Sequence, residues 1–141
     1  MSPLLVLYLT SLFTPLFYGT GFGMNEDAEE SIVIKARMRV ENAAVNDWKT
    51  LAECASTLLE HHIVSNDVRQ WIEKSMLIEE NYLNVSVYGD YYRLMKEFTT
   101  ANQYYIRAID LARKKNPGAI AGIQWKILVT LGTANYYSFQ K

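Results

Sequence analysis

The stretch of sequence that decides the fold is residues 85–108, VSVYGDYYRLMKEFTTANQYYIRA. Two small residues, Gly89 and Ala101, stand where two neighbouring helices would approach each other closely. Apolar residues around them recur at steps of three and four, which is the period of one helical face. They are Val85, Tyr88 and Tyr92 in the first half, and Ala101, Tyr105, Ala108 and Ala112 in the second. The spacing therefore predicts two helices packed against each other.

The boundaries of these two helices also follow from local signals. Residues 96–98 form the short connection between them. Thr100, followed three positions later by Gln103, has the pattern of a capping box, in which side chains accept hydrogen bonds from backbone amides at a helix start. Residues 116–118, Asn-Pro-Gly, are expected to end the second helix.

This pair of helices resembles a tetratricopeptide repeat. Val85 and Tyr88 occupy positions where Trp and Leu are usual in that family, and Tyr105 replaces its usual Phe. The family's terminal proline is expected near Arg113, whereas this chain has Pro117. The second helix is therefore expected to be about one turn longer than the family norm.

Weaker echoes of the pattern lie on both sides of this unit. Its opening half recurs at Trp48, Leu51, Ala52 and Ala55, and again at Leu128, Leu131, Gly132 and Asn135. For the last echo, Trp125 with Leu128 offers a competing register one turn earlier. The resemblance covers most of residues 48–141. The same stretch also resembles helical tails of some exported bacterial proteins of unassigned function.

The predicted fold is all-α. The resemblance implies a short right-handed solenoid of antiparallel helix pairs, and the apolar periodicity predicts six helices, at 26–44, 47–62, 67–80, 83–95, 100–115 and 119–139. Over 32–40, apolar and basic residues alternate as in a strand. However, good helix formers and an acidic cluster ahead of them favour a helix there. Asn46 or Asp47 is expected to cap the helix that carries Trp48.

The composition indicates one folded domain, over residues 24–141. The chain is 50% hydrophobic and 21% charged with only three Pro, which is too apolar for a disordered chain. Fourteen basic and fifteen acidic residues leave a net charge of −1. This balance argues against nucleic acid as the main partner, because phosphate binding requires a basic excess on one face.

Residues 1–23 differ from the rest of the chain. Residues 4–18 are almost wholly apolar, and no Lys or Arg occurs before Lys35. Gly21 and Gly23 suit a signal-peptide cleavage site, whereas a retained segment of this length would barely span a bilayer. A cleaved signal peptide, a membrane anchor and a cytosolic protein with an unusual start remain open. We expect an exported, periplasmic or membrane-associated protein, with a cytoplasmic one as the alternative.

No residue set identifies a reaction. His61 and His62 share a predicted helix with Cys54, but adjacent histidines diverge by about 100° on a helix, whereas a helical zinc pair sits four residues apart. Cys54 is expected to act as a small apolar residue. We expect neither a metal nor a cofactor. A hydrolase using carboxylates such as Asp90 or Glu97 in a cleft is the rival hypothesis.

The tetratricopeptide resemblance implies a concave face lined by the first helix of each repeat. Its positions fall on Lys49, Glu53, Ser56, Ser86, Asp90, Arg93, Thr133 and Tyr136. The family's carboxylate clamp of Lys and Asn is not reproduced at Ser86 and Asp90. We therefore expect a non-enzymatic scaffold that binds a peptide or protein partner.

The last predicted helix raises a second hypothesis. Its apolar residues spread over much of its circumference, so it is expected either to cap the stack or to pair with another chain, as in a homo-oligomer or an assembly subunit of an envelope complex. The tyrosine pairs 91–92, 104–105 and 136–137 are each expected to bury one member, because neighbours on a helix point apart.

Overall fold

The protein is described here by a computed structural model that covers residues 26–140. These residues form six α-helices and no strand. They are α1 (Glu26–Glu41), α2 (Trp48–Glu60), α3 (Asn66–Ile78), α4 (Tyr82–Leu94), α5 (Phe98–Lys115) and α6 (Ile120–Ser138), with a short 3-10 turn, Pro117–Ala119, before α6. The all-α prediction is confirmed, including a helix over 32–40. The predicted leader, residues 1–23, lies outside the described residues.

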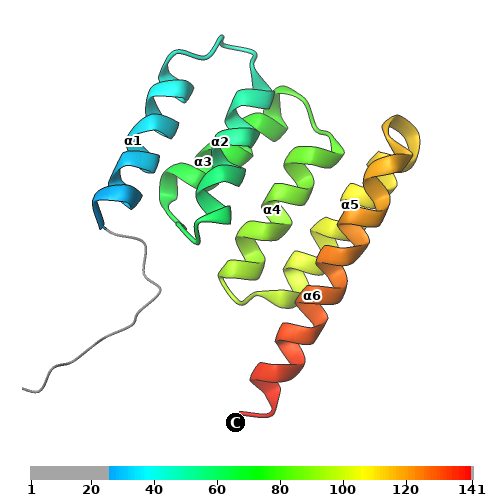
Figure 1. Cartoon of the computed structure of the whole chain (residues 1–141). Coiled ribbons are helices and arrows are strands. Elements are labelled where there is room, and N and C mark those ends of the chain that lie inside the picture. Colours follow the sequence, from blue (N-terminus) through cyan, green and yellow to red (C-terminus); the bar gives the residue numbers. More distant parts are fainter. Residues whose placement is uncertain (1–25, 141) are drawn as a thin grey trace, which may run out of the picture.

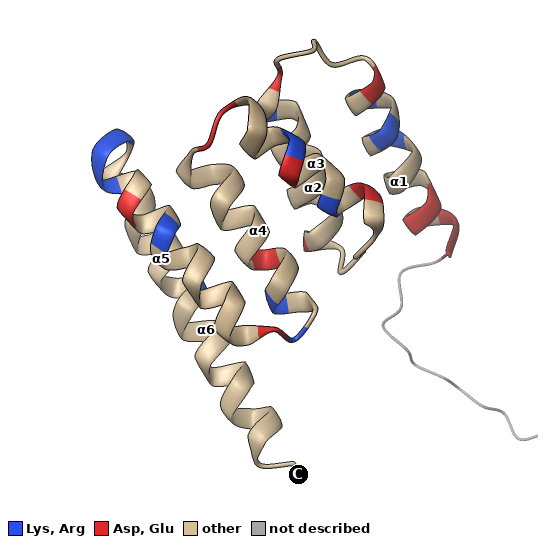
Figure 2. Cartoon of the chain, turned by 180° about the vertical axis from the view of Figure 1, so that it is seen from behind, with Lys and Arg blue, Asp and Glu red and all other residues tan. Residues whose placement is uncertain are grey.

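The helices lie side by side in chain order (Figure 1). Each helix packs on the next one along the chain, and α2 also packs on α4. The most extensive contact joins α4 to α5. The C-terminal half of α6 projects past the ends of α4 and α5 in both views of the ribbon (Figures 1 and 2). Within residues 26–140, no helix combines the length and the apolar content that a membrane crossing demands.

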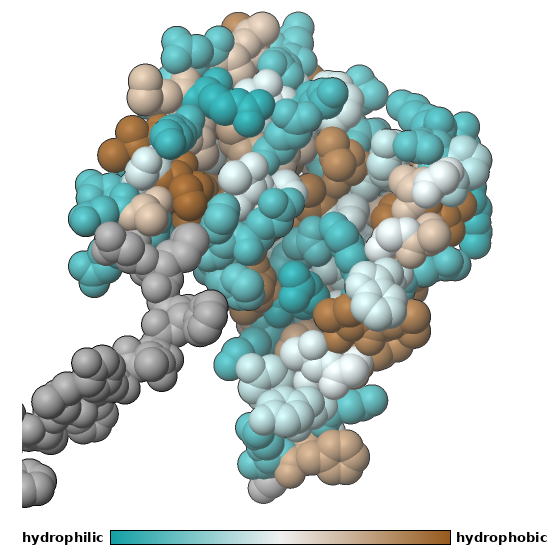
Figure 3. Space-filling view, viewed as in Figure 1, coloured by the Kyte–Doolittle hydropathy of each residue, from teal (hydrophilic) through white to brown (hydrophobic). Residues whose placement is uncertain are grey.

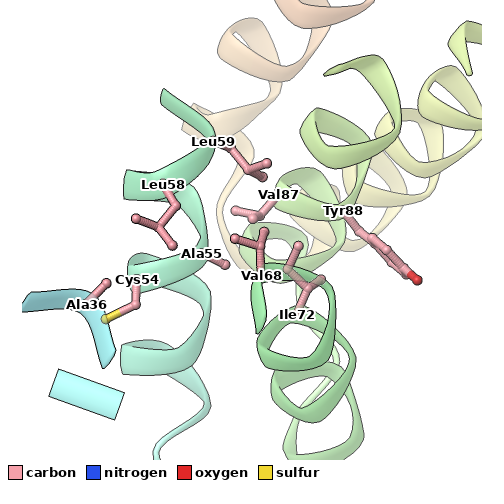
Figure 4. Packing of buried hydrophobic residues seen from close by; sticks show 9 residues of the cluster. All are labelled: Ala36, Cys54, Ala55, Leu58, Leu59, Val68, Ile72, Val87 and Tyr88. Atoms are coloured by element: carbon pink, nitrogen blue, oxygen red, sulfur yellow. The ribbon is translucent and has the colours of Figure 1, made fainter. Parts of the chain in front are cut away.

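The core has two clusters that meet at α4. The first joins α2, α3 and α4, with α1 adding Ala36 beside Cys54 (Figure 4). Its buried members are Ala36, Cys54, Ala55, Leu58, Leu59, Val68, Ile72, Val87 and Tyr88. The second joins α4, α5 and α6 through Val85, Ala101, Tyr105, Ala108, Ile109, Ala112 and Ile123. Because Val85 and Val87 belong to different clusters, α4 is buried on two faces and links the two halves.

Local side chains fix three helix starts. Asp47 accepts hydrogen bonds from the backbone N and the hydroxyl of Thr50, at 3.0 and 2.6 Å, as predicted for a cap of α2. The Thr50 hydroxyl is the main reason that the pKa of Asp47 is lowered. The side chain of Ser65 caps α3. Asn81 and Asn84 form a reciprocal capping box at α4.

The predicted capping box at Thr100 and Gln103 is wrong. Helix α5 begins earlier, at Phe98, and no side chain caps it. The cause lies in the end of α4, where Lys96 takes a left-handed backbone conformation with φ 63°. In this tight turn the Glu97 amide donates a hydrogen bond to the carbonyl oxygen of Tyr92 at 2.9 Å, and the next helix begins at the following residue, Phe98.

The tyrosine pairs follow the prediction only in part. Tyr105 is buried and Tyr104 half-buried, as expected. Residues 91 and 92 are both half-buried, so the prediction is wrong for this pair. The prediction is wrong for Tyr136 and Tyr137, which are both exposed. Both belong to the last turns of α6. The Tyr137 ring stacks on Phe98 of α5, with ring centroids 6.0 Å apart, and lies under the Lys96 ammonium at 4.8 Å, yet it remains 39% exposed.

Candidate partner-binding site

Three helices surround a pocket of about 280 Å³ that is open to solvent. Helices α2, α4 and α6 supply its lining, although they are separated in sequence. The lining residues are Ser56, Leu59, Glu60, Asp90, Arg93, Trp125, Lys126 and Val129. We call this set the groove pocket. Charged and apolar groups are mixed in it, so a ligand would meet both kinds of contact.

Asp90 is the centre of the polar side of the groove pocket. Its carboxylate accepts a hydrogen bond from the Tyr105 hydroxyl at 2.8 Å and pairs with the Lys126 ammonium at 2.5 Å. Lys126 also donates to the Ser86 hydroxyl at 3.1 Å. The side chain of Asp90 is only 14% exposed and that of Lys126 is 36% exposed. The pair is thus partly shielded from water, and each charge has its partner in place.

The phenol of Tyr105 acts as a fixed donor in this network. Burial is the main cause that raises its pKa, followed by the negative charge of Asp90 and the hydrogen bond to it. The phenol therefore stays protonated at neutral pH. Lys126 also stands over the Tyr105 ring, 5.9 Å from the ring centroid, which adds a weak cation–π attraction. The floor of the groove pocket is therefore preorganised.

Two other charged residues of the pocket, Arg93 and Glu60, form no ion pair within the described part of the chain. Glu60 accepts one hydrogen bond, from Ser56 at 3.2 Å. Arg93 is half-buried beside the pocket and Trp125 is 67% exposed. A guanidinium and an indole ring are the side chains most often used as anchors in protein recognition.

The structure brings together four of the eight residues predicted for the binding face. Ser56, Asp90 and Arg93 line the groove pocket, and Ser86 touches it through Lys126. These four come from α2 and α4. Their convergence follows from the contact between α2 and α4.

The other four predicted residues do not line this pocket. Lys49 and Glu53 pair with each other at 3.8 Å, and Arg39 of α1 reaches Glu53 at 3.1 Å. Thr133 donates its hydroxyl to a carbonyl oxygen of its own helix, at Val129, at 2.8 Å. Tyr136 is exposed and its ring lies edge-on to the neighbouring ring of residue 137. Lys49 and Glu53 therefore contribute to the contact between α1 and α2. Thr133 and Tyr136 lie farther along α6 than the groove pocket.

Sequence reasoning missed Leu59, Glu60, Trp125, Lys126 and Val129. On α6 the cause is the register. The echo that begins at Leu128 predicts Thr133 and Tyr136 for the binding face, whereas the competing register that begins at Trp125 places Lys126 there. One signal was available. Lys126 is the only charged residue of α6, and a lone charge on an apolar helix needs a partner if it is turned inward.

The geometry does not favour the rival hypothesis, a hydrolase that uses the carboxylates of Asp90 or Glu97. Asp90 is engaged by two partners, and Glu97 is exposed at the start of α5, outside the groove pocket. His61 ends α2 and Cys54 is buried at 1% exposure. Within residues 26–140 no three His, Cys, Asp or Glu side chains gather closely enough to hold a metal ion.

Comparison with known proteins adds no family or function to this geometry. Neither the protein-family models, nor the curated proteins, nor the solved structures contain a match to this chain.

Proposed function

We propose that this chain is a non-enzymatic interaction scaffold that holds an extended peptide segment of a protein partner in the groove pocket. One observation carries the proposal. The tetratricopeptide resemblance implies that Ser56, Asp90 and Arg93 are binding positions, and all three line one pocket between α2, α4 and α6. Pockets with a few convergent polar groups on an apolar wall are the usual form of a binding site.

We further propose that the six helices form a short right-handed tetratricopeptide-like solenoid. Two features support this proposal. Consecutive helices pack in chain order, and α2 also packs on α4, which is the contact between first helices of neighbouring repeats. The groove pocket is lined by α2, α4 and α6 alone, which would be the first helices of successive repeats.

The lining suggests what kind of segment the pocket takes. Asp90 and Lys126 neutralise each other, so they offer a fixed polar floor without net charge. Arg93 makes no ion pair among residues 26–140, and its guanidinium lies close to the Tyr105 hydroxyl, where it can meet an acidic group of the partner by a charge-assisted and bidentate hydrogen bond. Leu59, Trp125 and Val129 supply an apolar wall for a neighbouring aliphatic side chain. A segment that combines Asp or Glu with Leu or Val fits this arrangement.

The test is binding of short peptides to the full chain, measured by fluorescence anisotropy. The probes pair one Asp or Glu with Leu or Val at variable spacing, and scrambled basic peptides serve as controls. Arg93→Ala and Trp125→Ala are expected to weaken the tightest peptide at least about tenfold, because anchor residues dominate binding energy. Arg113→Ala, which removes an exposed arginine of α5, is expected to leave binding unchanged. Equal binding to all three variants would contradict the proposal.

We also propose that the protein is exported or membrane-associated. This rests on the apolar run over residues 4–18 and on Gly21 and Gly23, which suit a cleavage site. Mass spectrometry of the native protein tests it directly. A mature N-terminus near residues 21–24, or recovery in the membrane fraction with residues 1–23 retained, is expected. Recovery of the intact chain in the cytosolic fraction would contradict it.

A further inference from the structure

Helix α6 is apolar around most of its circumference, and yet only Ile123 and Thr130 are buried on it. A helix with this composition is ordinarily enclosed by protein on all sides. Its single charged residue, Lys126, turns toward Asp90 on α4. The rest of the helix is left without charge, as the uniformly tan C-terminal half of α6 shows (Figure 2). Hydrophobic surface gathers over the middle of α6 in the space-filling view (Figure 3).

The exposed residues follow a regular pattern. We define the outer face of α6 as Ala121, Trp125, Leu128, Gly132 and Asn135, together with Phe139 at the C-cap of the helix, all of which are exposed. They succeed one another at steps of four and three, which is the heptad spacing of a helix seam that packs on another helix. On a helical wheel they lie opposite Ile123 and Thr130, the two residues buried against the rest of the chain.

We propose that a second copy of this chain covers the outer face of α6, with the two α6 helices antiparallel about a two-fold axis near Thr130. In that register Leu128 meets Gly132 of the second copy, and Ala121 meets Phe139 of the second copy. Each contact sets a large side chain against a small one. A Cβ atom placed on Gly132 would meet nothing within 4 Å, so the space that the second copy's leucine requires is open.

The amount of apolar surface supports a dimer. Trp125 and Phe139, the two aromatic residues of the outer face, are 67% and 89% exposed. At about 150–250 Å² for each aromatic side chain, they expose on the order of 300 Å². Leu128 and the other residues of the face bring this to roughly 500 Å² per copy, which is about 1,000 Å² for a pair, the area that a specific interface has to reach.

The absence of charge favours a copy of the same chain over other occupants. Like charges brought together across a two-fold axis would oppose the pairing of two identical faces, and the outer face of α6 carries none. A helix that binds a membrane surface instead needs several Lys or Arg on its polar face. Helix α6 has one Lys, and Asp90 already holds it.

The first test is the mass of the full chain by sedimentation equilibrium. The unmodified chain is expected to dimerise. Leu128→Glu is expected to raise the dimer dissociation constant at least about 100-fold, because it buries an unpaired charge. Ile106→Glu is the matched control, since Ile106 is a similarly exposed apolar residue on α5, at 55% against 61% for Leu128. A monomeric unmodified chain, including one that binds anionic lipid vesicles, overturns the proposal. So does a dimer that survives Leu128→Glu.

A second test fixes the direction of the helices. Ala121→Cys and Phe139→Cys are made separately, and the two proteins are oxidised alone and after mixing. In the antiparallel dimer only the mixture is expected to give a cross-linked dimer, because the two copies of position 121 lie about 27 Å apart. A cross-link within each single variant indicates parallel helices and overturns the register. The native Cys54 is buried at 1% exposure and gives little background.

This inference is separable from peptide binding. Trp125 borders both surfaces, but Leu128 does not line the groove pocket. The full chain with Leu128→Glu is therefore expected to lose dimerisation and keep peptide binding, whereas Arg93→Ala is expected to do the reverse.

Discussion

Gly89 of α4 lies against the Cδ1–Cε1 side of the ring of Tyr105 of α5. A Cβ atom placed on Gly89 would stand 2.5 Å from Cε1 and 2.6 Å from Cδ1 of that ring. Tyr105 is fully buried, and its hydroxyl is held by Asp90, which also belongs to α4. The ring is thus fixed at both its edge and its hydroxyl. The close approach of α4 and α5 therefore depends on the missing side chain of Gly89.

Gly89→Ala is expected to lower the free energy of unfolding by about 1–3 kcal/mol, because the new methyl group overpacks the ring of Tyr105. Elsewhere in a helix the same change stabilises by roughly 0.5–1 kcal/mol. Gly122→Ala is the control, since nothing lies within 4 Å of a Cβ there. Urea unfolding followed by circular dichroism measures both, and equal midpoints would contradict the packing of α4 on α5.

Asp90→Ala is expected to cost about 2–3 kcal/mol of unfolding free energy, since it leaves the Tyr105 hydroxyl and the Lys126 ammonium without their acceptor. Lys126→Met is expected to cost less, because Lys126 is 36% exposed and water can replace part of the interaction. The double variant should cost less than the sum of the two. Asp110→Ala, which removes an exposed ion pair with Arg113, is the control and should change stability by about 0.5 kcal/mol or less. Additive costs at Asp90 and Lys126 would show that the two side chains are not coupled.

The α4–α5 unit was predictable because its signals agree with one another. Gly89 and Ala101 mark the close approach, and the apolar residues around them share one period. The cap at Asp47 was also predictable, because Asp directly before an apolar helix is a strong local signal. In contrast, the start of α5 depends on the left-handed conformation of Lys96. Such a conformation is usual for Gly and not signalled by Lys.

The candidate site was predictable on α2 and α4 and not on α6. Ser56, Asp90 and Arg93 lie on helices whose register is fixed by neighbours on both sides. On α6 the apolar residues cover most of the circumference, so periodicity alone does not select a register. The inward turn of Lys126 depends on its partner Asp90, which is 36 residues away in sequence. Long-range pairs of this kind leave no local signal.

His62 provides a test of the turn that ends α2. It has a left-handed backbone with φ 60°, and the amide of Ile63 bonds to the carbonyl oxygen of Leu58 at 2.9 Å. The left-handed conformation costs an L-residue roughly 1–2 kcal/mol, and glycine is free of most of that cost. We expect His62→Gly to raise the free energy of unfolding by about 1 kcal/mol. His61→Gly, at the preceding position where φ is −89°, should destabilise. Destabilisation by His62→Gly would contradict the turn.

Cys54 is expected to be unreactive in the folded protein. It is 1% exposed, and burial, as the main cause, raises its thiol pKa. Labelling by a thiol reagent at pH 8 should therefore follow the opening of the core and accelerate in parallel with unfolding in urea. Ser56→Cys, on the half-buried side of the same helix, provides a comparison and should react without unfolding. Rapid labelling of Cys54 in native buffer would contradict its burial between α1 and α2.

The decrease in the free energy of unfolding at alkaline pH is expected to depend on Tyr88 and Tyr105. The ordinary pKa of a tyrosine is 10.0, and burial raises it for both side chains in the folded protein. Above about pH 10 the unfolded chain releases phenol protons that the folded chain retains. The stabilisation from these groups is therefore complete below pH 10 and is lost as the pH rises toward the folded-state values.

Tyr105→Phe isolates one of these two contributions. The unmodified chain should lose unfolding free energy above pH 10 by at most about 1.4 kcal/mol per pH unit for each buried tyrosine. The Tyr105→Phe variant should be less stable at pH 8, because its hydrogen bond to Asp90 is gone, but should lose stability less steeply above pH 10. Urea midpoints between pH 8 and pH 11, with tyrosinate absorbance followed in parallel, measure both effects. Equal slopes for the two proteins would mean that the Tyr105 phenol ionises as readily in the folded chain as in the unfolded one, which its position between Gly89 and Asp90 does not allow.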